Sequence, residues 1–283
     1  MAASESYAND VVVTTEWVAE HLNDPGIRLV EVDVDTDAYA SGHIPGAIGW
    51  DWTIELEDQV QRDVPSRQAW EGLLSESGIG SDTKIVLYGD NNNWFATLAY
   101  WLAKMFGHQD VVIVNGGRKK WELEGRPLVT DTPQVERTSY QASDLDESLR
   151  VLYSQVREHI QQPSPALVDV RSPAEFSGEI IAPPGLPETA QRAGRIPGAT
   201  NVPWLQAVNE EDGTFKSAAD LRAVYERRGI SADQDIVVYC RIGERSSHSW
   251  FVLHELLGYD RVRNYDGSWT EWGNLIRAPI EKG

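Results

Sequence analysis

Cysteine is almost absent from this chain of 283 residues, which contains only Cys240. A single cysteine excludes an internal disulfide and a zinc site built on several cysteines. A free thiol is typical of a reducing compartment, where cellular reductants keep thiols unoxidised. We therefore expect a soluble, cytoplasmic protein.

Long apolar runs and an excess of basic residues are also missing. No apolar stretch approaches the roughly 20 residues of a membrane span, and residues 1–10 are polar and acidic, unlike a secretory signal. The formal net charge of −19 argues against a nucleic-acid or anionic-membrane surface. The six histidines show no ligand spacing, and no glycine-rich phosphate loop is present. We expect no metal, no cofactor, no nucleic-acid partner and no membrane contact.

The two halves of the sequence repeat each other. Matching segments occur in the same order, first at an offset of 138 residues and then at 151 or 152. A repeat this long indicates two whole domains rather than a solenoid of short units. We predict domains over residues 11–125 and 149–283, joined by a polar linker over residues 126–148. The matching pairs are Val18–Leu22 with Val156–Ile160, Leu29–Val32 with Leu167–Val170, Ile44–Ala47 with Ile196–Ala199, Ile85–Tyr88 with Ile236–Tyr239, and Gly116 and Trp121 with Gly267 and Trp272.

Each half alternates short apolar strands with helical segments. Strands that alternate with helices predict an α/β domain with a mainly parallel sheet flanked by helices. The jump in offset places a net insertion at residues 178–194, a proline-rich stretch that we expect to be a surface loop. A role in covering the active site is an alternative for this loop.

Cys240 follows a predicted buried strand at residues 235–239 and precedes a predicted helix at residues 247–257. Ligands of parallel sheets lie beyond the carboxyl ends of the strands. Backbone N–H groups in the intervening loop and the helix N-terminus favour an anion there. We expect the thiol to ionise more easily than usual, with Arg241 and Arg245 adding positive charge. A buried cysteine is often inert, but this setting favours an activated sulfur that faces an anionic substrate.

The position that matches Cys240 in the first half is Gly89. The first domain therefore has no nucleophile. We expect it to be non-catalytic and to serve as a scaffold.

Three stretches of the sequence resemble the signatures of the two-domain rhodaneses, the thiosulfate sulfurtransferases. Tyr39–Ala47 is similar to the N-terminal signature, with Tyr in place of the usual Phe, and Val262–Trp272 is similar to the C-terminal signature. Cys240–Ser246 resembles the active-site loop, in a bacterial-type form with Arg in its later part. The resemblance extends from about residue 11 to residue 280. It implies two tandem rhodanese-like domains, of which the second is catalytic.

The resemblance also implies a two-step sulfur transfer. The Cys240 thiolate attacks the outer sulfur of thiosulfate, sulfite leaves, and a persulfide remains until cyanide or a thiol acceptor takes the sulfur. Such covalent catalysis divides one difficult step into two easier ones.

Arg245 is our candidate for binding the sulfonate end of the donor, because its planar fork suits an anion with several oxygens. Arg171, just after a predicted strand, is a second candidate. The alternative for each arginine is a structural ion pair.

The sequence departs from the vertebrate rhodaneses at two positions. Ile242 stands where those enzymes carry Lys, and Glu175 aligns with an Arg; the family uses both groups to bind substrate. Their absence leaves Arg245 with more of the task.

Three other functions compete with this interpretation. A 3-mercaptopyruvate sulfurtransferase shares the fold and the persulfide, although its loop is typically small and neutral. A cysteine phosphatase needs five residues between Cys and Arg, whereas four separate Cys240 from Arg245. A sulfur carrier without turnover is the third alternative.

Overall fold

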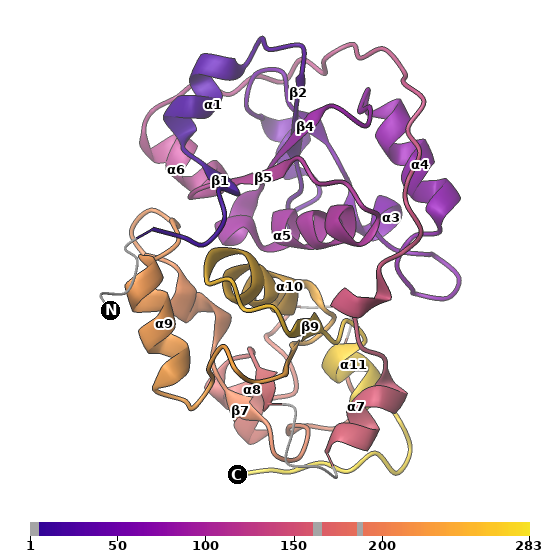
Figure 1. Cartoon of the computed structure of the whole chain (residues 1–283), viewed down its shortest axis with the longest axis vertical. Helices are drawn as coiled ribbons and strands as arrows, with labels where there is room; N and C mark the ends of the chain where they lie inside the picture. The colour runs from indigo at the N-terminus through magenta and orange to yellow at the C-terminus, as the bar shows by residue number, and fades with distance from the viewer. Residues whose placement is uncertain (1–5, 161–165, 186–188) are drawn as a thin grey trace. The chain divides into compact units, whose positions relative to one another are not determined.

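A computed structural model describes residues 6–160, 166–185 and 189–283. The chain divides into two compact units (Figure 1). The N-terminal unit comprises residues 10–146 and 209–215, and the C-terminal unit comprises the described parts of residues 1–9, 147–208 and 216–283. Residues 209–215 come late in the sequence, yet they pack with the first unit: Lys120 Nζ lies 3.0 Å from Asp212 Oδ2, and Phe215 N donates to Asn115 Oδ1.

The N-terminal unit has a five-stranded sheet in the order β1-β5-β4-β2-β3, and all its strand pairs are parallel. The strands are β1 (Val12–Val13), β2 (Ile27–Glu31), β3 (Ile48–Gly49), β4 (Lys84–Tyr88) and β5 (Val111–Val114). The helices are α1 (Thr15–His21), α2 (Ala38–Ser41), α3 (Trp52–Glu55), α4 (Arg67–Glu76), α5 (Asp90–Met105) and α6 (Gly117–Leu123).

The C-terminal unit repeats this pattern with a parallel sheet in the order β7-β6-β8-β9. The strands are β6 (Ala166–Asp169), β7 (Thr200–Asn201), β8 (Ile236–Tyr239) and β9 (Val262–Asn264). The α-helices are α7 (Tyr153–His159), α8 (Pro173–Ser177), α9 (Ala218–Glu226), α10 (Glu244–Trp250) and α11 (Ser268–Trp272). A π-helix, η3 (Phe251–Leu256), extends α10, and two 3₁₀ turns are η1 (Glu147–Leu149) and η2 (Trp204–Ala207). The predicted α/β class with parallel sheets is confirmed.

One interaction explains why the Ile-Pro-Gly-Ala motif occurs twice. In the N-terminal unit Ile44 N donates a 2.9 Å hydrogen bond to the hydroxyl of Tyr88, the last residue of β4. In the C-terminal unit Ile196 N donates to the Tyr239 hydroxyl at 3.1 Å. Each tyrosine is fully buried, so its hydroxyl needs a partner. In both halves this hydrogen bond therefore holds the motif in place against the end of the strand.

The insertion at residues 178–194 contains no helix or strand in its described part, and residues 186–188 lie outside the described residues. Gly178 ends α8 in the left-handed conformation. Near its other end, the Arg192 guanidinium donates to four backbone carbonyls at or just after the end of α11: those of Trp272, Gly273, Leu275 and Ala278. Gln191 N also donates to Asn274 Oδ1, and Trp269 Nε1 donates to Arg192 O. Several hydrogen bonds therefore tie this end of the insertion to the C-terminal segment of the chain.

Of the predicted linker, residues 126–146 run as irregular chain within the N-terminal unit, and residues 147 and 148 belong to η1 of the C-terminal unit. An isolated bridge pairs Val129 with His43, and Thr138 N donates to Ser75 O. Tyr140 and Ala142 are buried. No helix within the described residues is long and apolar enough to cross a bilayer.

The steric setting of Gly89 gives a prediction about stability. A Cβ atom at Gly89 would lie 2.1 Å from the Val32 carbonyl oxygen, whereas at Gly72 in α4 it would meet nothing within 4 Å. We expect Gly89→Ala to lower the free energy of unfolding by about 3 kcal/mol, because backbone must shift. Gly72→Ala should raise it by about 0.5–1 kcal/mol, because glycine disfavours helix. Urea unfolding measures both, and equal effects would contradict the steric argument.

Candidate functional site

Cys240 lies directly after β8, an interior strand of the C-terminal sheet, and is fully buried. Its backbone is held on both sides. Cys240 N donates to Ser268 Oγ at 3.0 Å, and Cys240 O accepts from Trp269 N at 3.1 Å. The stretch that resembles the C-terminal signature thus fixes the backbone of the candidate nucleophile.

The loop after Cys240 is shorter than the sequence predicted. Helix α10 begins at Glu244, three residues before the predicted start at Ser247. Gly243 makes the turn with a φ of 96°, and a Cβ there would lie 2.8 Å from the backbone of Asp266. This turn directs Gly243 N to Cys240 Sγ at 3.2 Å, so one backbone N–H donates to the sulfur.

A carboxylate of the chain itself lies beside the thiol. Glu244 Oε2 accepts the Cys240 S–H at 3.2 Å and Ile242 N–H at 3.0 Å. Glu244 is fully buried. The anion position that the sequence predicted for a substrate is therefore filled by a side chain, which sequence analysis did not single out.

This neighbour changes the chemistry of the sulfur. Burial and the negative charge of Glu244 raise the pKa of Cys240 above its usual value, against the opposing pull of Arg245 and the Ser246 hydroxyl. The prediction that the thiol ionises more easily is wrong for this state of the site. The sequence showed the two arginines but not which acids would face them.

Arg245 lies in a buried ion pair with Glu175. Its Nη1 and Nη2 each lie 3.0 Å from a carboxylate oxygen of Glu175. Glu175 also accepts from the N–H and hydroxyl of Ser172, as part of the capping box of α8. The Ser-x-x-Glu spacing could have indicated the capping box, but nothing in the sequence indicated Arg245 as its partner.

Arg171 is held in a second ion pair. Its Nε lies 3.0 Å from Asp169 Oδ1 and its Nη2 lies 2.6 Å from Asp169 Oδ2, while Nη2 also donates to Gly194 O. The guanidinium stacks over the Trp269 ring, 4.6 Å from its centroid. Both charged partners are fully buried. These contacts agree with the alternative that the sequence analysis gave for Arg171, a structural ion pair.

The charges around the sulfur nearly cancel. Arg241 Nη2 and Arg245 Nε each lie 3.7 Å from Glu244 Oε1, and Glu175 holds the fork of Arg245. His248 in α10 does not add a charge, because burial lowers its pKa to about 3. The site therefore combines two cations with two anions, whereas the sequence of the loop alone suggested a site with a net positive charge.

The corresponding loop of the N-terminal unit has no thiol. Gly89 N donates to Asn93 Oδ1 at 3.1 Å, and Asp90 N donates to Asp33 Oδ1 at 2.7 Å. Its backbone donors are thus engaged by side chains of the same unit. The arrangement leaves Cys240 as the candidate nucleophile of the chain.

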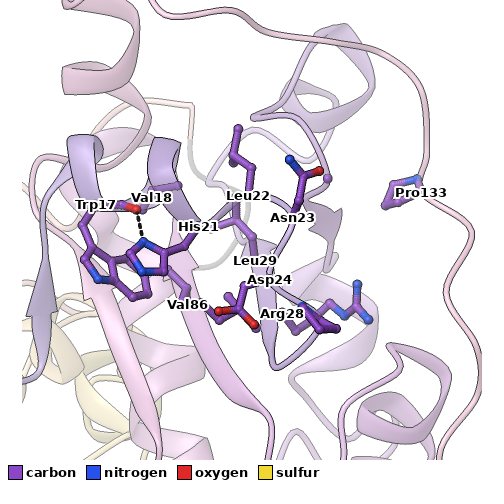
Figure 2. A pocket seen from close by; sticks show the side chains of 13 residues that line it. Trp17, Val18, His21, Leu22, Asn23, Asp24, Arg28, Leu29, Val86 and Pro133 are labelled. Atoms are coloured by element: carbon purple, nitrogen blue, oxygen red, sulfur yellow. Dashed lines mark hydrogen bonds between the residues drawn. The ribbon is translucent and has the colours of Figure 1, made fainter.

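A cavity of about 200 Å³ also lies in the N-terminal unit (Figure 2). Figure 2 shows Trp17 and His21 stacked at its wall, with ring centroids 4.1 Å apart. None of Cys240, Arg171 and Arg245 lines this cavity. Across the part of the chain that the structure describes, no group of three or more His, Cys, Asp and Glu side chains is placed to hold a metal ion.

Comparisons with known proteins agree with the duplicated fold. A family model described as "Rhodanese-like domain" matches residues 14–124 and 152–275. A Haloferax volcanii protein named "Putative thiosulfate sulfurtransferase" is 53% identical over 286 residues, covering 99% of each chain. The "Sulfur carrier protein TtuD" of Thermus thermophilus is 55% identical over 278 residues, covering 97% of each chain.

A solved structure is similar over nearly the same extent. SseA from Escherichia coli, described among the 3-mercaptopyruvate sulfotransferases, superposes with a TM-score of 0.78 at 28% identity. The match covers 91% of this chain and 98% of that one. Two rhodanese-like matches, together with relatives that share more than half of their residues along almost the full length, show that the chain belongs to the two-domain rhodanese family of sulfurtransferases.

Proposed function

We propose that the protein transfers the sulfane sulfur of thiosulfate to cyanide or a thiol acceptor through a persulfide on Cys240, releasing sulfite. The observation that carries this proposal is the position of the chain's single cysteine. It lies directly after an interior parallel strand, and a backbone N–H from a tight loop reaches its sulfur at 3.2 Å. A persulfide anion formed there is stabilised by such a donor without a general base from histidine.

The two steps balance without a cofactor. In the first, the Cys240 thiolate forms a bond to the outer sulfur of thiosulfate, the S–S bond of thiosulfate breaks, and its electron pair leaves with sulfite. In the second, cyanide or a thiolate attacks the outer sulfur of the persulfide, and the electron pair returns to Cys240. A free thiol of this kind supports a cytoplasmic location, where it stays reduced.

A non-turnover sulfur carrier is the second candidate. The name of the Thermus thermophilus relative supports it, and so does the raised pKa of Cys240, which disfavours rapid attack on a free anion. The likeness to SseA supports 3-mercaptopyruvate as an alternative donor.

The decisive experiment compares thiosulfate with 3-mercaptopyruvate as donors to cyanide under identical conditions. Intact-mass spectrometry after donor alone then reports any sulfur added to the protein. We expect turnover with thiosulfate and one added sulfur, both lost in Cys240→Ser, because that variant has no thiol to form the persulfide.

Each other outcome selects an alternative. Faster turnover with 3-mercaptopyruvate assigns that donor, and one added sulfur without turnover assigns the carrier function. Turnover by a folded Cys240→Ser protein contradicts the mechanism.

Arg245 is the cation that we propose for the sulfonate of the donor, since it is the arginine whose charge acts on Cys240. Arg245→Lys keeps the positive charge but loses the fork that holds Glu175. We expect kcat/KM for thiosulfate to fall about tenfold, equivalent to about 1.4 kcal/mol of transition-state binding. Arg228→Lys, at an exposed position, is the matched control. An unchanged kcat/KM in the folded Arg245→Lys protein excludes this role.

For Arg171 the contacts favour a structural role over donor binding. Arg171→Met leaves Asp169 buried without its partner and should lower the free energy of unfolding by about 3–5 kcal/mol. The double variant Asp169→Asn/Arg171→Met removes both charges and should recover part of that loss. Denaturant unfolding measures both. A stable double variant with a strongly raised KM for thiosulfate would instead show that Arg171 binds the donor.

A further inference from the structure

Glu244 and a persulfide need the same hydrogen-bond donor. The outer sulfur of a persulfide lies about 2 Å from the inner one and carries the negative charge that the loop N–H groups would stabilise. Ile242 N–H is already bonded to Glu244 Oε2 at 3.0 Å, and the same oxygen accepts the Cys240 S–H at 3.2 Å. A persulfide on Cys240 that binds Ile242 N–H would therefore compete with the Glu244 carboxylate for this donor.

Two guanidinium groups lie beside this carboxylate while the thiol is unloaded. Glu244 is fully buried, and its Oε1 lies 3.7 Å from Arg241 Nη2 and 3.7 Å from Arg245 Nε. Glu175 faces the other side of Arg245 and compensates most of its charge. Arg171 also acts electrostatically on Glu175, so the charges near Glu244 come from α8, from α10 and from the segments that precede these helices.

We propose that Glu244 is a catalytic residue that takes the proton of Cys240 when sulfur is loaded and, by competing for Ile242 N–H, keeps the persulfide less stable than it would otherwise be. The inference rests on the proposed function and adds a proton acceptor to it. A neutral carboxyl is a weaker acceptor than a carboxylate, so protonation of Glu244 releases the N–H to the outer sulfur.

The proton and charge balance follows directly. A thiol, a carboxylate and thiosulfate become a persulfide anion, a neutral carboxyl and sulfite, so the protein carries the same charge before and after loading. When an acceptor removes the outer sulfur, Glu244 returns the proton to the Cys240 thiolate and takes up Ile242 N–H again. The site thus binds the sulfur loosely and gives it up readily.

Glu244→Gln tests the proposal through the loading equilibrium. Glutamine has a similar shape but takes no proton and carries no negative charge, and its amide N–H can donate to the outer sulfur. At pH 8 and fixed thiosulfate-to-sulfite ratios, we expect the ratio of persulfide to thiol to rise at least about tenfold over the wild type, a change of about 1.4 kcal/mol. Intact-mass spectrometry measures this ratio. Glu158→Gln, which makes the same charge change at an exposed position of α7, should leave it unchanged.

A second measurement does not depend on sulfur transfer. Because Cys240 is the only cysteine, thiolate absorbance, taken as the difference from Cys240→Ser, reports its ionisation alone. Removal of the neighbouring negative charge should raise the ionisation constant about tenfold in Glu244→Gln and leave it unchanged in Glu158→Gln. If Glu244→Gln does not fold, Glu244→Asp, with a shorter side chain, should shift both quantities in the same direction by a smaller factor.

The outcomes separate this inference from the proposed function. A wild-type protein that takes no sulfur from thiosulfate overturns the proposed function, and the thiolate titration still decides whether Glu244 controls Cys240. Equal loading in the wild type and in both Gln variants overturns the role of Glu244 while the proposed function stands. An ionisation constant that is unchanged in folded Glu244→Gln also overturns it.

Discussion

Charge compensation within a closed space governs this site. Two arginines and two glutamates share the buried volume around Cys240, and each charge depends on a partner because water does not reach it. Glu175 pairs with Arg245, and Arg245 in turn faces Glu244, which accepts a hydrogen bond from the Cys240 thiol. A substitution at one of these residues therefore changes the electrostatic environment of the Cys240 sulfur through its effect on the others.

The duplicated fold provides the frame for this arrangement. In both units a turn at Ile-Pro-Gly-Ala is fixed by a buried tyrosine hydroxyl, and a parallel strand ends beside it. In the N-terminal unit the loop after that strand is engaged by Asp33 and Asn93. In the C-terminal unit it carries a thiol and a carboxylate. The same backbone thus supports a loop with the candidate nucleophile in one half and a loop without a thiol in the other.

The fold was predictable from the sequence because it rests on local signals. Repeated apolar segments predicted the strands, and the position of Cys240 after a strand predicted that it lies at the carboxyl end of the sheet. Glu244 was not predicted, because α10 starts earlier than its apolar spacing indicated and so turns this side chain inward. The partners of Arg245 and Arg171 were not predictable for a related reason: a sequence shows charges, whereas chain geometry selects which of them meet. The packing of residues 209–215 with the N-terminal unit likewise depends on contacts far apart in the sequence.

The contact at Gly89 also bears on how the two halves diverged. The Val32 carbonyl oxygen lies only 2.1 Å from the place of a Cβ atom, so a cysteine at this position carries the same steric cost as alanine. A single mutation to cysteine therefore lowers the stability of the N-terminal half, because the backbone just after β2 would have to shift. The packing around Gly89 thus opposes the return of any side chain to this position during evolution, whatever its chemistry.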